Sequence, residues 1–234
     1  MSAVLDAGLV TDEAAFMAQH LPLVGARIVE LGCGKAELAR RLLEQHGAAE
    51  VTGFEVDERQ HAANLAAPPF PGLRFAAGGA EAIPLPDACC DGVMMLKSLH
   101  HVPMPLMDQA LREIARVLVP GGWLYVSEPV YAGEFNELVK RFHDEGEVRA
   151  AAYAALQRAA EQGVLAWEQE VVFDTPLHFR DWADFEGRIV LATHADHRLA
   201  PELERQVREH FQRHVGDDGA RFVRQMRINF LARR

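Results

Sequence analysis

Cysteine is scarce in this sequence, and long apolar runs are missing altogether. Only three of the 234 residues are cysteine, namely Cys33 and the adjacent pair Cys89 and Cys90. An odd number with an adjacent pair makes a poor disulfide framework, and no spacing suggests a zinc site. No run of about 18 or more apolar residues is present, so we expect no membrane span. The N-terminus lacks the basic and apolar segments of a signal peptide, which predicts a cytoplasmic protein.

Basic residues are few relative to acidic ones. The chain has 24 lysines and arginines against 34 aspartates and glutamates, for a formal net charge of −10 at pH 7. A general nucleic-acid binder normally shows the opposite balance, so a nucleic-acid partner is not expected. The arginines near the C-terminus are therefore interpreted as a solvated face of the last predicted strand: Arg221, Arg224, Arg227, Arg233 and Arg234.

The residues that are present fit one α/β domain. Hydrophobic residues make up 49% of the chain and charged residues 25%, which is ordinary for a globular protein. We predict a single domain, 1–234, that forms a monomer or a homodimer. Its predicted parts are an N-terminal helix in 1–24, a ligand-binding core in 25–130, a helical cap or substrate region with one sheet strand in 131–220, and a C-terminal strand in 221–234.

Strands and helices alternate along most of the sequence. Short apolar runs predict seven strands, at residues 27–31, 51–56, 73–76, 91–96, 123–128, 167–173 and 222–231. Apolar residues at helical spacing predict helices at 11–20, 36–46, 58–65, 105–118, 134–162, 179–191 and 201–214. Thr11 is placed to cap the first helix, and the fifth is expected to break near Gly146. The pattern predicts a doubly wound, mostly parallel seven-stranded sheet with helices on both faces and a helical cap insertion.

A glycine-rich turn joins the strand at 27–31 to the helix at 36–46. Gly32 and Gly34 have no Cβ, so the backbone can bend sharply there and a ligand can lie against it. The helix that follows presents free N–H groups at its start. Glu55, at the end of the next strand, is placed to accept two hydrogen bonds from a ribose diol. The turn and the acid together predict a site for a nucleotide-type ligand.

The same turn argues against a dinucleotide. The dinucleotide fingerprint requires a third glycine three positions after the second, and that position is Glu37. S-adenosylmethionine (SAM) has no phosphates and carries an ammonium and a sulfonium group. Glu30, directly before the turn, suits these positive charges. The residues therefore favour SAM over NAD.

Residues 30–36, which read E-L-G-C-G-K-A, resemble motif I of the class I SAM-dependent methyltransferases, often written E/D-x-G-x-G-x-G. Residues 80–87 with Asp91 resemble the "D-A-E-x-L-P-F-P-D … F-D" stretch of the small-molecule, methyltransferase type 11-like branch, and 99–102 and 116–122 match its next two signatures. The resemblance covers about residues 25–130. It implies a Rossmann-like fold, SAM as the cofactor, S-adenosyl-L-homocysteine as the product, and methyl transfer as the activity.

The resemblance also implies cofactor-binding roles for particular residues. Those expected around the methionine and ribose are Glu30, Gly32, Cys33, Gly34 and Glu55, with Glu55 on the ribose hydroxyls. Those expected around the adenine are Val56, Ala80 and Glu81, and those below the methionyl and sulfonium groups are Leu96 and Lys97. Cys33 lies at a helix start, so we expect a somewhat lowered pKa for its thiol and a packing role.

Two positions depart from the family pattern. Ala36 replaces the usual third glycine, which is expected to shift the helix start slightly. Gly79 stands where an aspartate often contacts the adenine amino group, and Glu81 either compensates for that loss or leaves the contact unfilled.

The acceptor side is less defined by the sequence. Methyl transfer needs a general base only when the acceptor must lose a proton. His101 is a candidate base, and Glu128, at the end of the fifth strand, is a candidate base or substrate anchor. Candidate acceptor contacts are His100, Arg180 and Trp182. The alternative for each of these residues is a structural role in local packing or hydrogen bonding.

His194 and His197, with Asp196 between them, would share a helical face. The spacing supplies no third ligand, so we predict no metal site.

The leading hypothesis is a SAM-dependent methyltransferase that acts on a small molecule through an O, N or C atom. One alternative is an RNA or protein methyltransferase, which a basic groove around Arg141, Arg149 and Arg158 would favour. The other is a non-catalytic partner protein with the SAM-binding fold.

Overall fold

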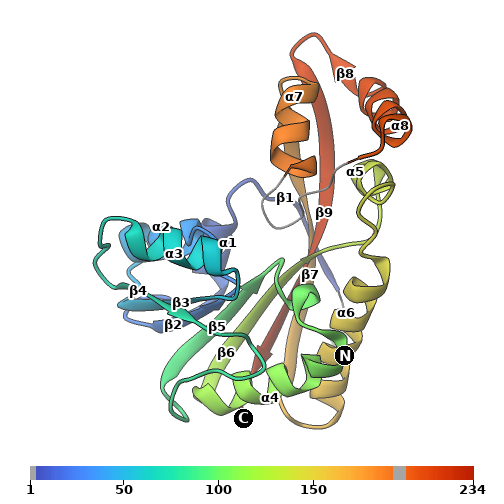
Figure 1. The fold of residues 1–234 in the computed structure, drawn as a ribbon. Coiled ribbons are helices and arrows are strands. Elements are labelled where there is room, and N and C mark those ends of the chain that lie inside the picture. The colour runs from blue at the N-terminus through green and yellow to red at the C-terminus, as the bar shows by residue number, and fades with distance from the viewer. Residues whose placement is uncertain (1–3, 192–198) are drawn as a thin grey trace.

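The computed structural model describes residues 4–191 and 199–234, which build a mixed sheet with helices on both faces (Figure 1). Its strands are β1 (Leu5–Leu9), β2 (Arg27–Leu31), β3 (Glu50–Glu55), β4 (Leu73–Ala77), β5 (Cys90–Leu96), β6 (Leu118–Pro129), β7 (Ala166–Phe179), β8 (Val215–Gly216) and β9 (Gly219–Ala232). Its helices are α1 (Glu13–His20), α2 (Glu37–Gln45), α3 (Glu58–Ala66), α4 (Met107–Val117), α5 (Glu134–Val139), α6 (Gly146–Glu161), α7 (Trp182–Phe185) and α8 (Pro201–Gln212). Shorter turns form the 3-10 helices η1 (Leu99–His101) and η2 (Met104–Leu106) and the π-helix η3 (Glu186–Val190).

The strand order is β1-β7-β9-β6-β5-β2-β3-β4, with β8 beside β9. The five adjacent strands β6-β5-β2-β3-β4 are all parallel to one another, and β1 is parallel to β7. Among the strands that the structure describes, only β9 runs in the opposite direction, because it lies antiparallel to β6 and β7 and forms a hairpin with β8. The carboxyl ends of the parallel strands therefore meet at one edge, where doubly wound sheets bind ligands.

Two apolar cores cover the two faces of the sheet. Successive side chains of a strand point to opposite faces, so neighbouring residues of β2 belong to different cores. Ile28 packs with residues of α1 and α2, whereas Val29 packs with residues of α4 and α6. This separation confirms the predicted α/β class with helices on both faces.

A third apolar cluster lies away from these two cores. β9 pairs with β6 only as far as Met226, and beyond that point it continues with β7 alone. We call this extension, residues 174–179 and 219–225, the β7–β9 arm. In Figure 1 the arm carries α7 and α8 at its far end. The cluster on it joins the arm to α5, α7 and α8 through Phe135, Phe179, Phe185, Phe211 and Phe222.

Several predicted elements differ from the observed ones. The described sheet has nine strands and not seven, because β1 and β8 were missed. All five residues of β1 are exposed and β8 has only two residues, so neither shows the apolar run of a buried strand. The helix expected at 179–191 begins at Trp182, since β7 extends to Phe179. Asp12, not Thr11, accepts the capping hydrogen bond of α1 from the Ala15 N–H.

No helix within the described ranges is both long enough and apolar enough to cross a membrane.

Candidate functional site

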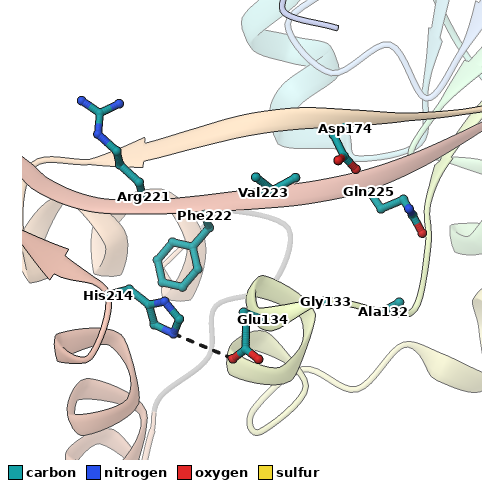
Figure 2. A pocket seen from close by; sticks show the side chains of 9 residues that line it. All are labelled: Ala132, Gly133, Glu134, Asp174, His214, Arg221, Phe222, Val223 and Gln225. Carbon is teal, nitrogen blue, oxygen red and sulfur yellow. Dashed lines mark ion pairs between the residues drawn. The ribbon is translucent and has the colours of Figure 1, made fainter. Parts of the chain in front are cut away.

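A small hollow of about 490 Å³ lies on the β7–β9 arm beside the start of α5 (Figure 2). Glu134 and His214 approach each other across it, with 3.9 Å between a carboxylate oxygen and Nε2. None of the residues that the sequence predicts for the site line this hollow. We therefore look for the site in a second, larger cavity.

The larger cavity has a volume of about 850 Å³ and lies at the carboxyl ends of β2, β3, β5 and β6. Nine of the predicted site residues line it: Gly32, Gly34, Glu55, Val56, Ala80, Glu81, Lys97, His100 and His101. The same cavity is also lined by residues of α5, the loop before α6, η3 and β9. One space thus joins the glycine-rich turn to the helical cap.

The glycine-rich turn is shaped by close packing against Ser98. Gly32 has a φ of +73°, and a Cβ added there would lie 2.7 Å from the Ser98 Cβ. Ser98 Oγ donates a hydrogen bond of 2.7 Å to the Leu31 carbonyl, which keeps the serine in place. Gly34 also has a positive φ, +51°, but no atom lies within 4 Å of its would-be Cβ. Gly32 is therefore required by packing, whereas Gly34 leaves open space beside the cavity.

Ala36 adopts the left-handed conformation that the family pattern gives to a glycine. Its φ is 54° at the N-cap of α2, and it is completely buried. An alanine in this region costs about 1–2 kcal/mol, which the surrounding packing has to offset. The helix begins at Glu37, one residue later than predicted.

The Glu55 carboxylate ties this turn to the end of β3. One oxygen accepts the Gly34 N–H at 2.8 Å, and the other accepts the N–H groups of Val56 at 2.8 Å and Asp57 at 2.9 Å. A carboxylate oxygen has two lone pairs and also accepts bonds out of its plane, so the oxygen facing Gly34 retains capacity for a ligand hydroxyl. The acid is thus held rigidly at the cavity wall.

Glu30 lies beneath the turn, and it does not line the cavity. It is 5% exposed, and its Oε2 has no hydrogen-bond partner among the described residues. Burial, together with the charge of Glu55, raises the pKa of Glu30 to about 8. An orphaned buried carboxyl beside a pocket fits a cationic ligand, because a nearby positive charge favours the ionised form. SAM, with its ammonium and sulfonium groups, has that character.

Besides Glu30, two more of the predicted cofactor residues, Cys33 and Leu96, do not line the cavity. Both pack instead in the core beneath α1 and α2. Burial, followed by the charges of Glu30 and Glu55, raises the pKa of the Cys33 thiol to about 12. The expectation of a lowered pKa for the Cys33 thiol was wrong. The loss of hydration on burial raises this pKa by more than the N-terminus of the helix lowers it.

Glu81 occupies the space that a side chain at position 79 would need. A Cβ added to Gly79 would overlap the Glu81 carboxylate. Both residues line the cavity, next to Ala80. The acid expected at position 79 in the family pattern is therefore replaced in space by an acid two residues later.

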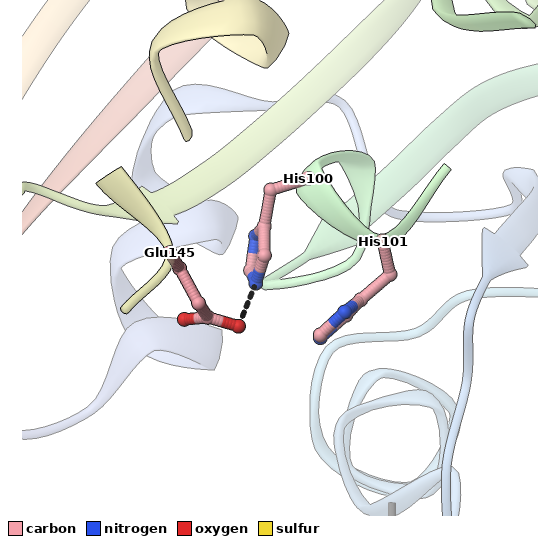
Figure 3. Close-up of side chains that lie close together, drawn as sticks. All are labelled: His100, His101 and Glu145. Atoms are coloured by element: carbon pink, nitrogen blue, oxygen red, sulfur yellow. Dashed lines mark ion pairs between the residues drawn. The ribbon is translucent and has the colours of Figure 1, made fainter. Parts of the chain in front are cut away.

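His100 is held between two carboxylates, those of Glu128 and Glu145, and Figure 3 shows its contact with Glu145. Its Nδ1 forms an ion pair with Glu128, whose other oxygen accepts the Leu99 N–H at 2.9 Å. Its Nε2 lies 3.4 Å from Glu145, which in turn pairs with Arg149 at 2.5 Å. Burial alone would lower the pKa of His100, but the bonds to Glu128 and Glu145 outweigh it and raise the pKa to about 9. His100 is therefore an imidazolium at neutral pH.

Glu128 is buried, 3% exposed, and does not line the cavity. Both its oxygens are engaged, with the Leu99 N–H and with His100. This arrangement suits a residue that positions η1 better than one that accepts a proton from an acceptor.

His101 is exposed to the cavity, with its ring centroid 4.1 Å from that of His100. It remains the candidate base. One ligand atom each of His100, His101 and Glu145 also lie within 4.8 Å of one another. A metal ion there would have to replace the proton that His100 shares with Glu145, and the expectation of no metal site stays a prediction. The pair His194 and His197 lies outside the described residues.

We expect the stability of the protein to fall as the pH rises from about 6.5 to 9. The folded pKa of His100 is above the ordinary value of 6.5, so the folded state binds the proton more tightly than the unfolded state does. The resulting stabilisation is complete below about pH 6.5 and is lost through pH 9, on the order of 3 kcal/mol in all. Urea unfolding at several pH values measures it. The variant His100→Gln should show a flatter profile, and equal slopes in both proteins would refute the ion-pair account.

Arg180 and Trp182 were expected to contact the acceptor, and neither lines the cavity. Trp182 packs in the aromatic cluster of the arm, against Phe185 and Phe211. Arg180 points to solvent and pairs with Asp184 at 3.2 Å. The aromatic residues of this segment pack in the local core, and the structure does not place Arg180 or Trp182 at the cavity.

The C-terminal arginines do not form one solvated face as expected. Arg221 is exposed and pairs with Asp218. Arg224 instead lines the cavity, and Arg227 lies 3.6 Å above the centre of the Tyr153 ring. Arg224 lies between Phe222 and Met226 on the same face of β9, and both neighbours are buried. A single arginine on an otherwise apolar strand face indicates a cation that is turned toward the interior, and the sequence analysis missed this pattern.

A basic groove of Arg141, Arg149 and Arg158 is not formed. Arg158 pairs with Asp108 at 2.7 Å, and Arg149 pairs with Glu145 inside the cavity. Arg141 donates a hydrogen bond to His210. The feature that would favour an RNA or protein acceptor is therefore not supported.

Comparison with known proteins agrees with the motifs. A family model described as a methyltransferase domain matches residues 29–126. The chain is 30% identical over 174 residues to a fatty-acid O-methyltransferase of Mycolicibacterium smegmatis, covering 70% of this chain and 60% of that protein. It is 38% identical over 124 residues to the 27-O-demethylrifamycin SV methyltransferase of Amycolatopsis mediterranei, covering 51% and 43%. The chain spans about half the length of the curated relatives it matches.

Solved structures show the same fold at low sequence identity. The YcgJ protein from Bacillus subtilis matches with a TM-score of 0.63 and 18% identity, covering 94% of this chain and 97% of that one. The [4+2]-cyclase SpnF matches with a TM-score of 0.57 and 19% identity, covering 94% and 79%. At this level of identity the likeness establishes the fold, and the function has to be argued from the site.

Proposed function

Since the chain belongs to the class I SAM-dependent methyltransferase superfamily, we propose that it methylates a small-molecule acceptor, with SAM as the methyl donor. The observation that carries this proposal is the single cavity of about 850 Å³, which joins the turn at Gly32 and Gly34 and the acid Glu55 to the helical cap. SAM supplies an electrophilic methyl carbon on a sulfonium, so the chain mainly has to position the acceptor.

The proposed cofactor residues have distinct tasks. The backbone at Gly32 and Gly34 would lie against the ligand, and Glu55 would accept the ribose hydroxyls. Glu30 would balance the positive charges of the methionyl part, since its carboxyl is buried without a hydrogen-bond partner on one oxygen. His101 would accept a proton where the acceptor has to lose one, because His100 is already protonated.

A small-molecule acceptor is favoured by three observations. The cavity is lined by side chains of the cap as well as of the sheet edge. The arginines that would build a nucleic-acid groove are engaged with other side chains. The curated relatives include enzymes whose names specify a fatty acid and a demethylrifamycin as acceptors.

The proposal is tested by offering the protein methyl-labelled SAM with three separate acceptor pools: a filtered small-molecule extract, total RNA and total protein. We expect label to transfer only in the small-molecule pool. Transfer to RNA or protein alone would show that the acceptor class is wrong. No transfer in any pool, with SAM bound normally, would favour a non-catalytic protein with this fold.

We propose that Glu81 supplies the adenine contact that Gly79 cannot make. Removing its carboxylate in Glu81→Ala should weaken SAM binding by about 1.5–3 kcal/mol, the scale of a hydrogen bond to a charged group. The double variant Gly79→Asp with Glu81→Ala should recover most of the affinity, because it places a carboxylate in the same space. Isothermal titration calorimetry measures both. Full affinity in Glu81→Ala would exclude the contact.

A further inference from the structure

Arg224 lies on the wall of the cavity and has no ion-pair partner among the described residues. It comes from the β7–β9 arm, and its guanidinium lies 4.9 Å from the centre of the Phe135 ring. Within residues 4–191 and 199–234, no carboxylate lies within ion-pair distance of it and no acceptor is within hydrogen-bond distance. Other arginines on the cavity wall do have such partners: Arg149 pairs with Glu145, and Arg188 pairs with Asp184.

The surroundings of Arg224 make this arrangement costly. Burial lowers the pKa of Arg224 to about 10, and Arg149 and Arg188 lower it while Glu145 raises it. Burial lowers the pKa of Lys97, and Arg224 is close enough to lower it further. A partly buried cation among other cations is destabilising unless an anion joins it. Glu145, the carboxylate that raises the pKa of Arg224, is already shared by His100, His143 and Arg149.

The cavity around Arg224 has apolar as well as charged lining residues. Four side chains of α5, the following loop and η3 line it together with Arg224: Phe135, Val139, Phe142 and Ile189. A ligand with an apolar part and one negative charge fits these four side chains and Arg224.

We propose, on the basis of the proposed function, that the acceptor is an apolar organic acid whose carboxylate is bound by Arg224. A guanidinium presents a planar fork of N–H donors that matches a carboxylate. One unpaired arginine balances one negative charge, which favours a carboxylate over a phosphate dianion. The apolar part of the acid packs against the side chains of α5 and η3.

The competing occupant of Arg224 is the cofactor's own methionine carboxylate. The two assignments differ in what an Arg224 variant loses. If Arg224 binds the acceptor, the variant loses affinity for acids and keeps its affinity for the cofactor product. If it binds the methionine carboxylate, the affinity for the cofactor product falls.

The experiment titrates the full chain first with S-adenosyl-L-homocysteine, and then titrates the saturated protein with straight-chain acids from hexanoate to hexadecanoate and with their uncharged amides. We expect at least one acid to bind about tenfold or more tightly than its amide, the scale of a charged hydrogen bond. Arg224→Met should remove this preference and Arg224→Lys should retain part of it. Arg221→Met, on the exposed part of the same strand, is the matched control and should behave as the parent protein.

Each other result contradicts the proposal. If no acid binds better than its amide, the acceptor is not an apolar acid. If Arg224→Met still binds the acid more tightly than the amide, a residue other than Arg224 binds the carboxylate. If Arg224→Met instead weakens S-adenosyl-L-homocysteine about tenfold, Arg224 serves the cofactor. Failure of the parent protein to bind S-adenosyl-L-homocysteine at all would refute the proposed function separately, because that titration comes first.

Discussion

Gly32→Ala is expected to destabilise the protein by about 2–5 kcal/mol, through left-handed strain of about 1–2 kcal/mol and overpacking of about 1–3 kcal/mol. The φ of Gly32 is +73°, and the added methyl would lie 2.7 Å from the Ser98 Cβ. Ser98 cannot move away cheaply, because its hydroxyl is bonded to the Leu31 carbonyl. Urea denaturation at fixed pH measures the loss.

Gly34→Ala is the matched control for this prediction. It introduces the same methyl at a positive φ of +51°, with no atom within 4 Å. It should cost only the strain, about 1–2 kcal/mol, and should instead weaken SAM binding because the methyl enters open space beside the cavity. Equal destabilisation by the two substitutions would show that packing against Ser98 does not determine the choice of glycine at position 32.

Glu55→Ala is expected to weaken SAM binding by about 1.5–3 kcal/mol, or roughly 10- to 150-fold. Without the carboxylate, the ribose hydroxyls would lose their hydrogen-bond acceptor. The backbone N–H groups of Gly34, Val56 and Asp57 would lose theirs as well. Calorimetry with SAM and S-adenosyl-L-homocysteine measures the affinity.

A loss of affinity in Glu55→Ala could follow from disorder of the turn alone, so the conservative variant Glu55→Gln is needed. It keeps one acceptor oxygen for the backbone and removes the charge. We expect an intermediate affinity for Glu55→Gln and a thermal midpoint close to that of the parent protein. Unchanged SAM affinity in Glu55→Ala would show that the ribose assignment is wrong.

The meeting of the glycine-rich turn with Glu55 was predictable because its signals are local. Gly32 and Gly34 stand within one turn, and Glu55 ends the next strand, so their meeting follows from two neighbouring parallel strands. The fold class followed from the same alternation. Edge strand β1 gave no comparable signal, since all its residues are exposed.

The cap side of the cavity was not predictable in the same way. Glu145, Arg149 and Arg224 come from the loop before α6, from α6 and from β9, and only the folded chain brings them to one cavity. Trp182 is an aromatic residue of a kind that often contacts ligands, but in the structure it packs against the apolar cluster of the β7–β9 arm. Periodicity shows which side of an element is buried, and it does not show which buried side faces a ligand.

The central claim, that the cavity at the glycine turn binds SAM, is tested most directly by titrating the full chain with S-adenosyl-L-homocysteine. We predict one binding site per chain, with affinity reduced about 10- to 150-fold in Glu55→Ala. No binding heat at millimolar ligand, from a protein that unfolds cooperatively, would contradict the claim.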